Sequence, residues 1–182
     1  MLGAPSILMV GTIEPRKAHA QALAAFERLW AEGTAVNLVI VGKQGWMVEA
    51  LVERLRNHPE KGRRLFWIEG ANDALLLRIY AAATALLAAS EGEGFGLPLI
   101  EAAQHGLPII ARDLDVFKEV AGEHAFYFNG GVHELAARLN EWLSLHAQQK
   151  QPLSAKMPWL TWRESAKQLI AVVNHDGWYQ KA

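Results

Sequence analysis

The chain has 182 residues, of which 51% are hydrophobic, a formal net charge of −1 and no cysteine. That length and hydrophobic content suffice for one well-formed core, and a charge near zero gives no general attraction to nucleic acid or to an anionic membrane. The lack of cysteine excludes disulfide bonds and thiolate metal sites, and it suits a reducing compartment.

Short apolar segments alternate with helical patterns along the whole chain. The segments predicted as strands are 6–10, 36–41, 65–68, 85–89, 108–111 and 125–128. Helices are predicted at 18–30, 47–55 and 73–83, then from residue 97 and at 132–146. Asp73 is the predicted N-cap of the third helix. Residues 148–158 have the composition of a linker, and residues 159–173 form a final amphipathic pattern.

Strands that are apolar at every position are buried on both faces, which is typical of parallel strands covered by helices. The alternation therefore predicts an α/β fold: a Rossmann-like, doubly wound parallel sheet of about six strands in a single domain. The N-terminal residues lack the basic region of a secretion signal, and the most apolar segment, 79–89, is too short to cross a bilayer. We therefore expect a cytoplasmic protein with no transmembrane segment and no nucleic-acid partner.

The first loop with unusual chemistry is GTIEPRKAH, residues 11–19, which follows the first predicted strand. Gly11 lets a ligand approach the backbone, and Pro15 stiffens the loop. Arg16 and Lys17 place two cations at a predicted helix start, where free N–H groups already favour anions. A pyrophosphate fits this loop, and the alternative is a pair of solvated cations.

The second such loop lies in EGEGFGLPLIEAA, residues 91–103, after the fourth predicted strand. Pro98 suits the first turn of the next helix, because its missing N–H would have no partner there. Glu93 and Glu101 are expected to face one cleft, on either side of a cluster of main-chain N–H groups. These belong to Gly94, Phe95, Gly96 and Leu97. The arrangement suits a ligand with hydroxyls at both ends and phosphate in the middle, such as a nucleotide sugar.

Each glutamate also has an ordinary interpretation. Glu101 is then a surface residue favoured by the helix dipole, and Glu93 a turn residue, but neither explains three glycines in five residues. The spacing of these glycines is not that of a dinucleotide-binding GxGxxG motif, which argues against a dehydrogenase.

These motifs resemble those of a known family. EGFGLPLIEA followed by GLPIIARD is similar to the signature of family 4 retaining glycosyltransferases, whose two glutamates are separated by seven residues. GTIEPRK resembles that family's diphosphate-binding loop, and its form with Thr12, Glu14, Pro15 and Arg16 is most similar to bacterial mannosyltransferases of O-antigen and related polysaccharides. DLDVFKEVAGEHAFYF, residues 113–128, continues the match, which covers residue 7 to about residue 173.

The resemblance implies a GT-B fold, in which two Rossmann-like domains face one another across a cleft. This chain matches the C-terminal half, so residues 1–150 would bind the nucleotide-sugar donor. Residues 151–182 would form a helical segment that packs on this domain or reaches toward the N-terminal one. The implied reaction transfers a hexose with retention to a saccharide acceptor, and mannose from GDP-mannose is the favoured donor.

The resemblance also implies roles for individual residues. Glu93 would hold donor-sugar hydroxyls and Glu101 the ribose, while Lys17 and Arg16 would neutralise the departing diphosphate. The implied catalytic residues are Glu93, Lys17 and Arg16. The implied donor-binding residues are Gly11, Thr12, Glu93, Gly94, Phe95, Gly96, Leu97 and Glu101, with Ile68, Glu69 and Gly70 against the base. No metal or other cofactor is expected, because the cations and the helix dipole supply the electrostatic stabilisation.

Two departures from the family pattern matter. Thr12 stands where many relatives carry arginine, and the acceptor-binding N-terminal domain has no counterpart here. The chain is therefore expected to be an excised domain or the tail of a longer polypeptide, which binds nucleotide but transfers almost no sugar alone. The acceptor, and any peripheral attachment to the inner face of the cytoplasmic membrane, would involve the missing half. A non-catalytic nucleotide-sugar binding module and another GT-B enzyme, such as an epimerase, are alternatives that the Glu93/Glu101 pair disfavours.

Histidines and tryptophans receive mostly structural interpretations. The seven histidines, including His19, show no metal-ligand spacing and are expected at the surface or as hydrogen-bonded core residues. Trp142 is expected in the core. Near the C-terminus, Trp159, Trp162 and Trp178 are expected either to form an exposed interface patch or to pack on the sheet.

Overall fold

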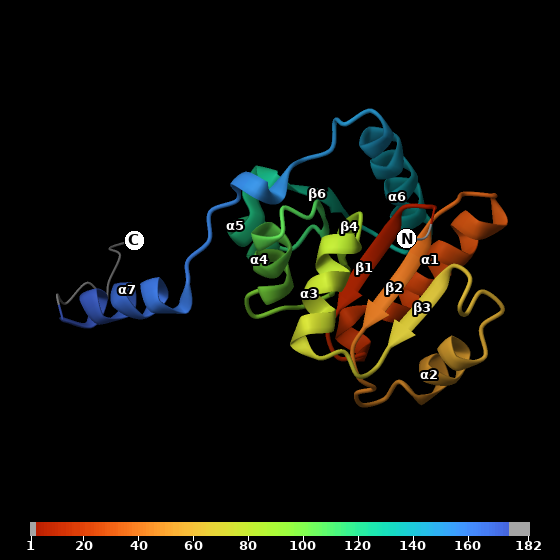
Figure 1. Cartoon of the computed structure of the whole chain (residues 1–182), viewed down its shortest axis with the longest axis horizontal. Coiled ribbons are helices and arrows are strands. Elements are labelled where there is room, and N and C mark those ends of the chain that lie inside the picture. Colours follow the sequence, from red (N-terminus) through yellow and green to blue (C-terminus); the bar gives the residue numbers. More distant parts are fainter. Residues whose placement is uncertain (1–2, 175–182) are drawn as a thin grey trace.

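The structure, a computed structural model, describes residues 3–174, which contain a six-stranded parallel sheet with helices on both faces (Figure 1). The strands are β1 (Ser6–Val10), β2 (Asn37–Val41), β3 (Leu65–Ile68), β4 (Ala85–Ala88), β5 (Ile109–Arg112) and β6 (Ala125–Phe128). Their order across the sheet is β3-β2-β1-β4-β5-β6, and every neighbouring pair is parallel. The predicted fold class is confirmed.

Seven α-helices lie within the described residues. They are α1 (His19–Ala31), α2 (Glu49–Arg56), α3 (Asp73–Ala82), α4 (Leu97–Gln104), α5 (Asp115–Ala121), α6 (Val132–Ala147) and α7 (Trp162–Asn174). Short 3₁₀ turns occupy Pro15–Lys17, Gly122–His124 and Ser154–Lys156. Helix α5, which buries Phe117 and Ala121, was not predicted from the sequence.

Two hydrophobic cores lie on opposite faces of the sheet. One contains side chains of α1, α2 and α6, and the other contains side chains of α3, α4 and α5. Successive residues of a strand point to opposite faces, so Ile7 joins the first core and Leu8 the second. This burial on both sides is the reason why the strands are apolar at every position. Trp142 of α6 is fully buried, as predicted.

Several predicted element boundaries were wrong. Asn72, rather than Asp73, caps α3, because its side chain accepts a hydrogen bond from the N–H of Leu75 at 2.9 Å. The second helix begins at Glu49, since Met47 has a positive φ of 52° that lies outside a right-handed helix. Asn and Asp are nearly equal as N-caps, so composition did not separate these two neighbours.

The stretch 148–158 is not a free linker. Ser154 is fully buried, and its hydroxyl donates to the carbonyl oxygen of Leu107 at 2.6 Å, while Met157 joins the second core. Beyond it, α7 stands away from the sheet (Figure 1), and Trp162 is 81% exposed. Trp159 is 41% exposed, and Trp178 lies outside the described residues. No helix within residues 3–174 has both the length and the hydropathy needed to span a bilayer.

Candidate functional site

The loops after β1 and β4 meet where the strand order reverses. These two strands are neighbours, although the chain passes through β2 and β3 between them. The N–H of Glu91 donates to the carbonyl oxygen of Arg16 at 2.7 Å, which joins the two loops directly. Ligands of doubly wound sheets bind in the crevice at such a reversal. We call the carboxyl ends of β1 and β4 the switch point.

The β1 loop is also held against the loop after β2. The N–H groups of Gly11 and Ile13 donate to the carbonyl oxygens of Val41 and Lys43, both at 2.9 Å. A Cβ on Gly42 would lie only 1.8 Å from the carbonyl oxygen of Gly11, so only glycine permits this approach of two backbones. The loop that carries the two cations is therefore anchored on both sides.

The sequence suggested that Arg16 and Lys17 lie at the start of the first helix, but they do not lie in the first turn of α1. They form a separate 3₁₀ turn, and Ala18 follows in the left-handed conformation with φ 54° before α1 begins at His19. The chain direction changes at Ala18, so the turn and the helix are distinct units. This turn presents both cations to the β4 loop.

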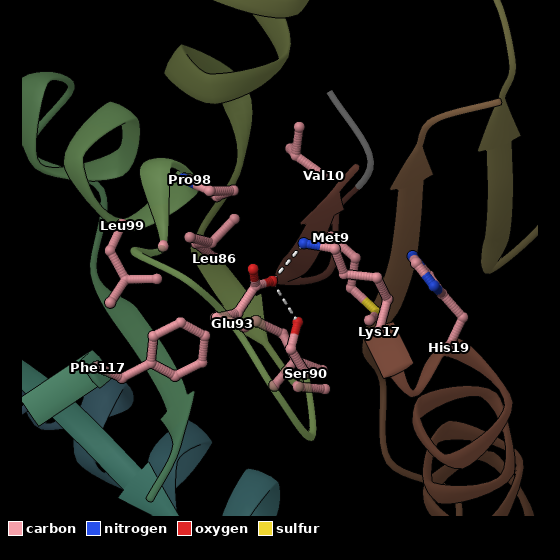
Figure 2. Close-up of a pocket in the computed structure, with 14 residues that line it drawn as sticks. Met9, Val10, Lys17, His19, Leu86, Ser90, Glu93, Pro98, Leu99 and Phe117 are labelled. Carbon is pink, nitrogen blue, oxygen red and sulfur yellow. Dashed lines mark hydrogen bonds and ion pairs between the residues drawn. The ribbon is translucent and has the colours of Figure 1, made fainter. Parts of the chain in front are cut away.

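Glu93 lies between these cations at the switch point. Its Oε1 pairs with the ammonium of Lys17 and accepts from the Ser90 hydroxyl at 2.8 Å (Figure 2). Its Oε2 lies 3.1 Å from Nη1 of Arg16. Burial alone would raise the pKa of Glu93, but the hydrogen bonds from Lys17 and Ser90 outweigh it and hold the pKa below its ordinary value. Glu93 is therefore an anion whose neutralising partners are 76 and 77 residues away in sequence.

The β4 loop ends in a conformation that requires glycine. Gly96 is the N-cap of α4 with a φ of +94°, and Pro98 lies in the first turn as predicted. The side chains of Phe95 and Leu97 are exposed. Four consecutive main-chain N–H groups of this loop and the start of α4 donate no hydrogen bond to any atom of residues 3–174. They belong to Gly94, Phe95, Gly96 and Leu97.

Replacing Gly96 with alanine is expected to lower the free energy of unfolding by about 2 kcal/mol, because alanine is strained at this φ. Its Cβ would also lie 2.9 Å from Cε1 of Phe117. Gly92→Ala is the matched control, since a Cβ there meets nothing within 4 Å, and we expect a change below about 0.5 kcal/mol. Urea unfolding of both variants measures the difference, and equal stabilities would contradict the prediction.

A cavity of about 20 Å³ lies beside Glu93, room for about one water molecule. Lys17, Ser90 and Glu93 contribute polar atoms to its lining, which also includes His19 and is otherwise mostly apolar (Figure 2). His19 is only 2% exposed, and neither ring nitrogen has a hydrogen-bond partner within the described residues. The expectation of a surface or hydrogen-bonded histidine was therefore wrong at this position. Burial, reinforced by the charge of Lys17, lowers the pKa of His19 to about 4, so its ring is neutral.

Glu101 lies on α4 and is held by a residue that was not predicted to belong to the site. Its Oε2 accepts a hydrogen bond from the hydroxyl of Tyr80 on α3, at 2.6 Å. A buried tyrosine usually finds such a partner, but the partner could not be identified from the sequence because α3 and α4 meet only in the folded chain.

Residues 2–156 match the family described as Glycosyl transferases group 1. The chain belongs to this family. It is 56% identical over 171 residues to the serotype-specific mannosyltransferase WbdA of Escherichia coli, a match that covers 93% of the chain and 21% of WbdA. It is 34% identical over 120 residues to the O-antigen chain mannosyltransferase B of Escherichia coli, which covers 64% of the chain and 30% of that protein. The chain thus spans about a fifth of WbdA.

Two solved structures share the fold of the chain. The C-terminal domain of the family member LpcC from Francisella tularensis matches with a TM-score of 0.68 at 19% identity, over 81% of the chain and 79% of that domain. Anabaena HepE, solved with UDP and glucose, matches with a TM-score of 0.73 at 18% identity, over 95% of the chain and 48% of HepE. The chain therefore has the architecture of a GT-B C-terminal domain.

The predicted site residues of this group 1 domain occupy one edge of the sheet, but they are not all in contact. The loops after β1 and β4 bring Arg16, Lys17 and Glu93 together, and Thr12 lies exposed in the first of them. The segment 68–70 begins at the last residue of β3, two strands away from β1. There, Glu69 pairs with Arg56 at 3.3 Å, and Ile68 accepts a main-chain hydrogen bond from Gly42. Ser90, which was not predicted as a site residue, follows β4 and donates a hydrogen bond to Glu93.

Proposed function

We propose that this chain is the donor-binding domain of a retaining glycosyltransferase that transfers mannose from GDP-mannose to a saccharide acceptor in cell-surface polysaccharide synthesis. The observation that carries the proposal is the placement of Glu93 between Lys17 and Arg16 at the switch point, one loop before α4 and Glu101. The mannosyltransferase relatives support mannose as the sugar. The choice of a guanine nucleotide as its carrier rests on the resemblance of the GTIEPRK loop alone.

The proposed mechanism assigns charge stabilisation to the β1 loop. As the glycosidic bond to the phosphate breaks, negative charge develops on the leaving diphosphate, and Lys17 and Arg16 stabilise it. The unpaired N–H groups at the start of α4 add fixed donors for phosphate or sugar oxygens. Metal is not required in this scheme, because the charge is met by the two side chains and the helix N-terminus.

The two glutamates are proposed to hold the ends of the donor. When a diphosphate takes over Lys17 and Arg16, the Glu93 carboxylate is left to accept hydrogen bonds from sugar hydroxyls, while Glu101 accepts from the ribose. The base would lie against residues 68–70. We propose that the acceptor is bound by a second domain, since the chain spans only 21% of WbdA, so the chain alone is expected to bind nucleotide and transfer almost no sugar. The proposed setting is the cytoplasm, with any attachment to the inner face of its membrane made outside this chain.

Calorimetric titration of GDP, UDP and ADP into the chain tests the proposal. GDP is expected to bind most tightly, and Glu101→Ala is expected to weaken GDP binding about tenfold, which corresponds to the loss of about one charge-assisted hydrogen bond. Glu53→Ala is the control, since Glu53 is an exposed glutamate on α2, on the opposite face of the sheet. Failure of all three nucleotides to bind, or equal binding by the Glu101 variant, would contradict the assignment, and equal affinities would contradict a guanine donor.

A further inference from the structure

Tyr80 contacts α4 both through its hydroxyl and through its ring. The side chain comes from α3 and is only 2% exposed within the second core. Its hydroxyl donates to Oε2 of Glu101 at 2.6 Å. Its ring stacks on His105, the C-cap of α4, with centroids 5.2 Å apart and planes 6° from parallel. Tyr80 is thus fixed relative to the helix that carries Glu101.

Only one of the two carboxylate oxygens of Glu101 accepts a hydrogen bond within the described residues. Oε2 is occupied by Tyr80, whereas Oε1 accepts no hydrogen bond from any atom of residues 3–174. Glu101 is half-buried, and Oε1 is not among the inaccessible side-chain atoms that lack a partner, so Oε1 remains open to a ligand. Burial, together with the hydrogen bond to Glu101, raises the pKa of Tyr80 above its ordinary value, so the phenol stays a donor near neutral pH.

A glutamate that binds a ligand through one oxygen benefits from a fixed rotamer. An exposed glutamate samples several χ angles, and ordering it on binding costs about 1 kcal/mol. A buried hydroxyl that holds the other oxygen imposes this order before the ligand arrives, as groups behind a metal or catalytic ligand do. The ring of Tyr80 is itself fixed by core packing, so it transmits the rigidity of the core to the carboxylate.

We propose that Tyr80 is a positioning residue that orients Glu101 toward the ribose hydroxyls and so makes the site selective for ribonucleotides. The inference rests on the proposed function, because it takes the ribose to be the ligand of Glu101. The inference nevertheless adds a claim of its own. The binding energy from the two ribose hydroxyls depends on the Tyr80 hydroxyl, which never touches the nucleotide.

Tyr80→Phe isolates this hydroxyl, because phenylalanine keeps the ring, its packing and its stacking on His105. The titrants are GDP and 2′,3′-dideoxy-GDP, which lacks both hydroxyls of the sugar. We expect the substitution to weaken GDP binding between about fivefold and tenfold, and to change the affinity for the dideoxy nucleotide less than twofold, since a tenfold loss corresponds to about one hydrogen bond.

Tyr127→Phe is the matched control. The hydroxyl of Tyr127 donates to the carbonyl oxygen of Gly122 at 2.8 Å, so this variant also loses a tyrosine hydrogen bond, but one that does not involve Glu101. Its GDP affinity is expected to equal that of the unaltered chain. Thermal unfolding of both variants shows whether each remains folded under the conditions of the titration.

Three results would overturn the inference. The GDP affinity of Tyr80→Phe could be unchanged, both nucleotides could lose affinity equally, or the Tyr127 control could lose as much as Tyr80→Phe. Equal losses for the two nucleotides would assign Tyr80 to general packing while leaving the proposed function intact. If the unaltered chain bound no GDP, the proposed function would fail and the inference with it. The titration of the unaltered chain therefore distinguishes failure of the proposed function from failure of the inference about Tyr80.

Discussion

Replacing Lys17 with alanine is expected to lower the affinity of the chain for GDP about a hundredfold. In the proposed complex the ammonium makes charge-assisted hydrogen bonds to the diphosphate, and a hundredfold loss corresponds to about 2.7 kcal/mol, within the usual range for such groups. Lys17 is well placed for this role, because its side chain is half-buried and lines the switch-point cavity. Calorimetry with GDP measures the loss.

The substitution Glu93→Gln, in contrast, is not expected to lower the affinity for GDP. It removes the carboxylate that pairs with Lys17 and Arg16 in the free chain, so both cations become more available to a diphosphate. GDP affinity is therefore expected to stay constant or rise, although sugar binding is lost. For Lys17→Ala, the control for the change in net charge is Lys150→Ala, which removes an exposed lysine that lies three residues after α6. If Lys17→Ala bound GDP as tightly as this control does, the β1 loop would not be the diphosphate site.

The stability of the chain is expected to depend on the ionisation of His19. Its pKa is lowered to about 4 in the folded chain, against 6.5 as the ordinary value. Between these values the unfolded chain binds a proton that the folded chain rejects, so stability falls as the pH drops from about 6.5 toward 4. The difference in pKa corresponds to a loss of about 3 kcal/mol, complete only below the folded-state pKa. Above pH 6.5 this histidine makes no pH-dependent contribution.

Urea unfolding at pH 7.5, 6.0 and 5.0 tests this prediction in the unaltered chain and in His19→Leu. The variant is expected to lose the part of the pH dependence that belongs to His19, and to be at least as stable at pH 7.5, because it removes two buried nitrogens without partners. His133→Leu, which removes an exposed histidine of α6, is expected to follow the unaltered chain. Parallel pH curves for the unaltered chain and His19→Leu would show that His19 does not titrate as the structure indicates.

Much of the architecture was predictable because its signals are local. Strand and helix segments follow from the period of apolar residues, and parallel pairing follows from strands such as β1, which is apolar from Ile7 to Val10. The errors occurred where neighbouring residues have similar propensities, as with Asn72 and Asp73. They also occurred where burial depends on distant segments, as for residues 148–158, which looked like a linker until Ser154 was seen to bond Leu107.

The sequence by itself determined the α/β class, the two chemically unusual loops and the pair of glutamates, because glycine, proline and charge patterns act over a few residues. Only the tertiary structure decided the strand order, and with it the contact of Glu93 with Lys17 and Arg16. It also decided the bond from Tyr80 to Glu101 and the burial of His19 without a partner. These features have one physical reason in common. Each depends on which elements lie next to one another in the sheet or on one of its faces, and the packing of the whole chain sets that arrangement.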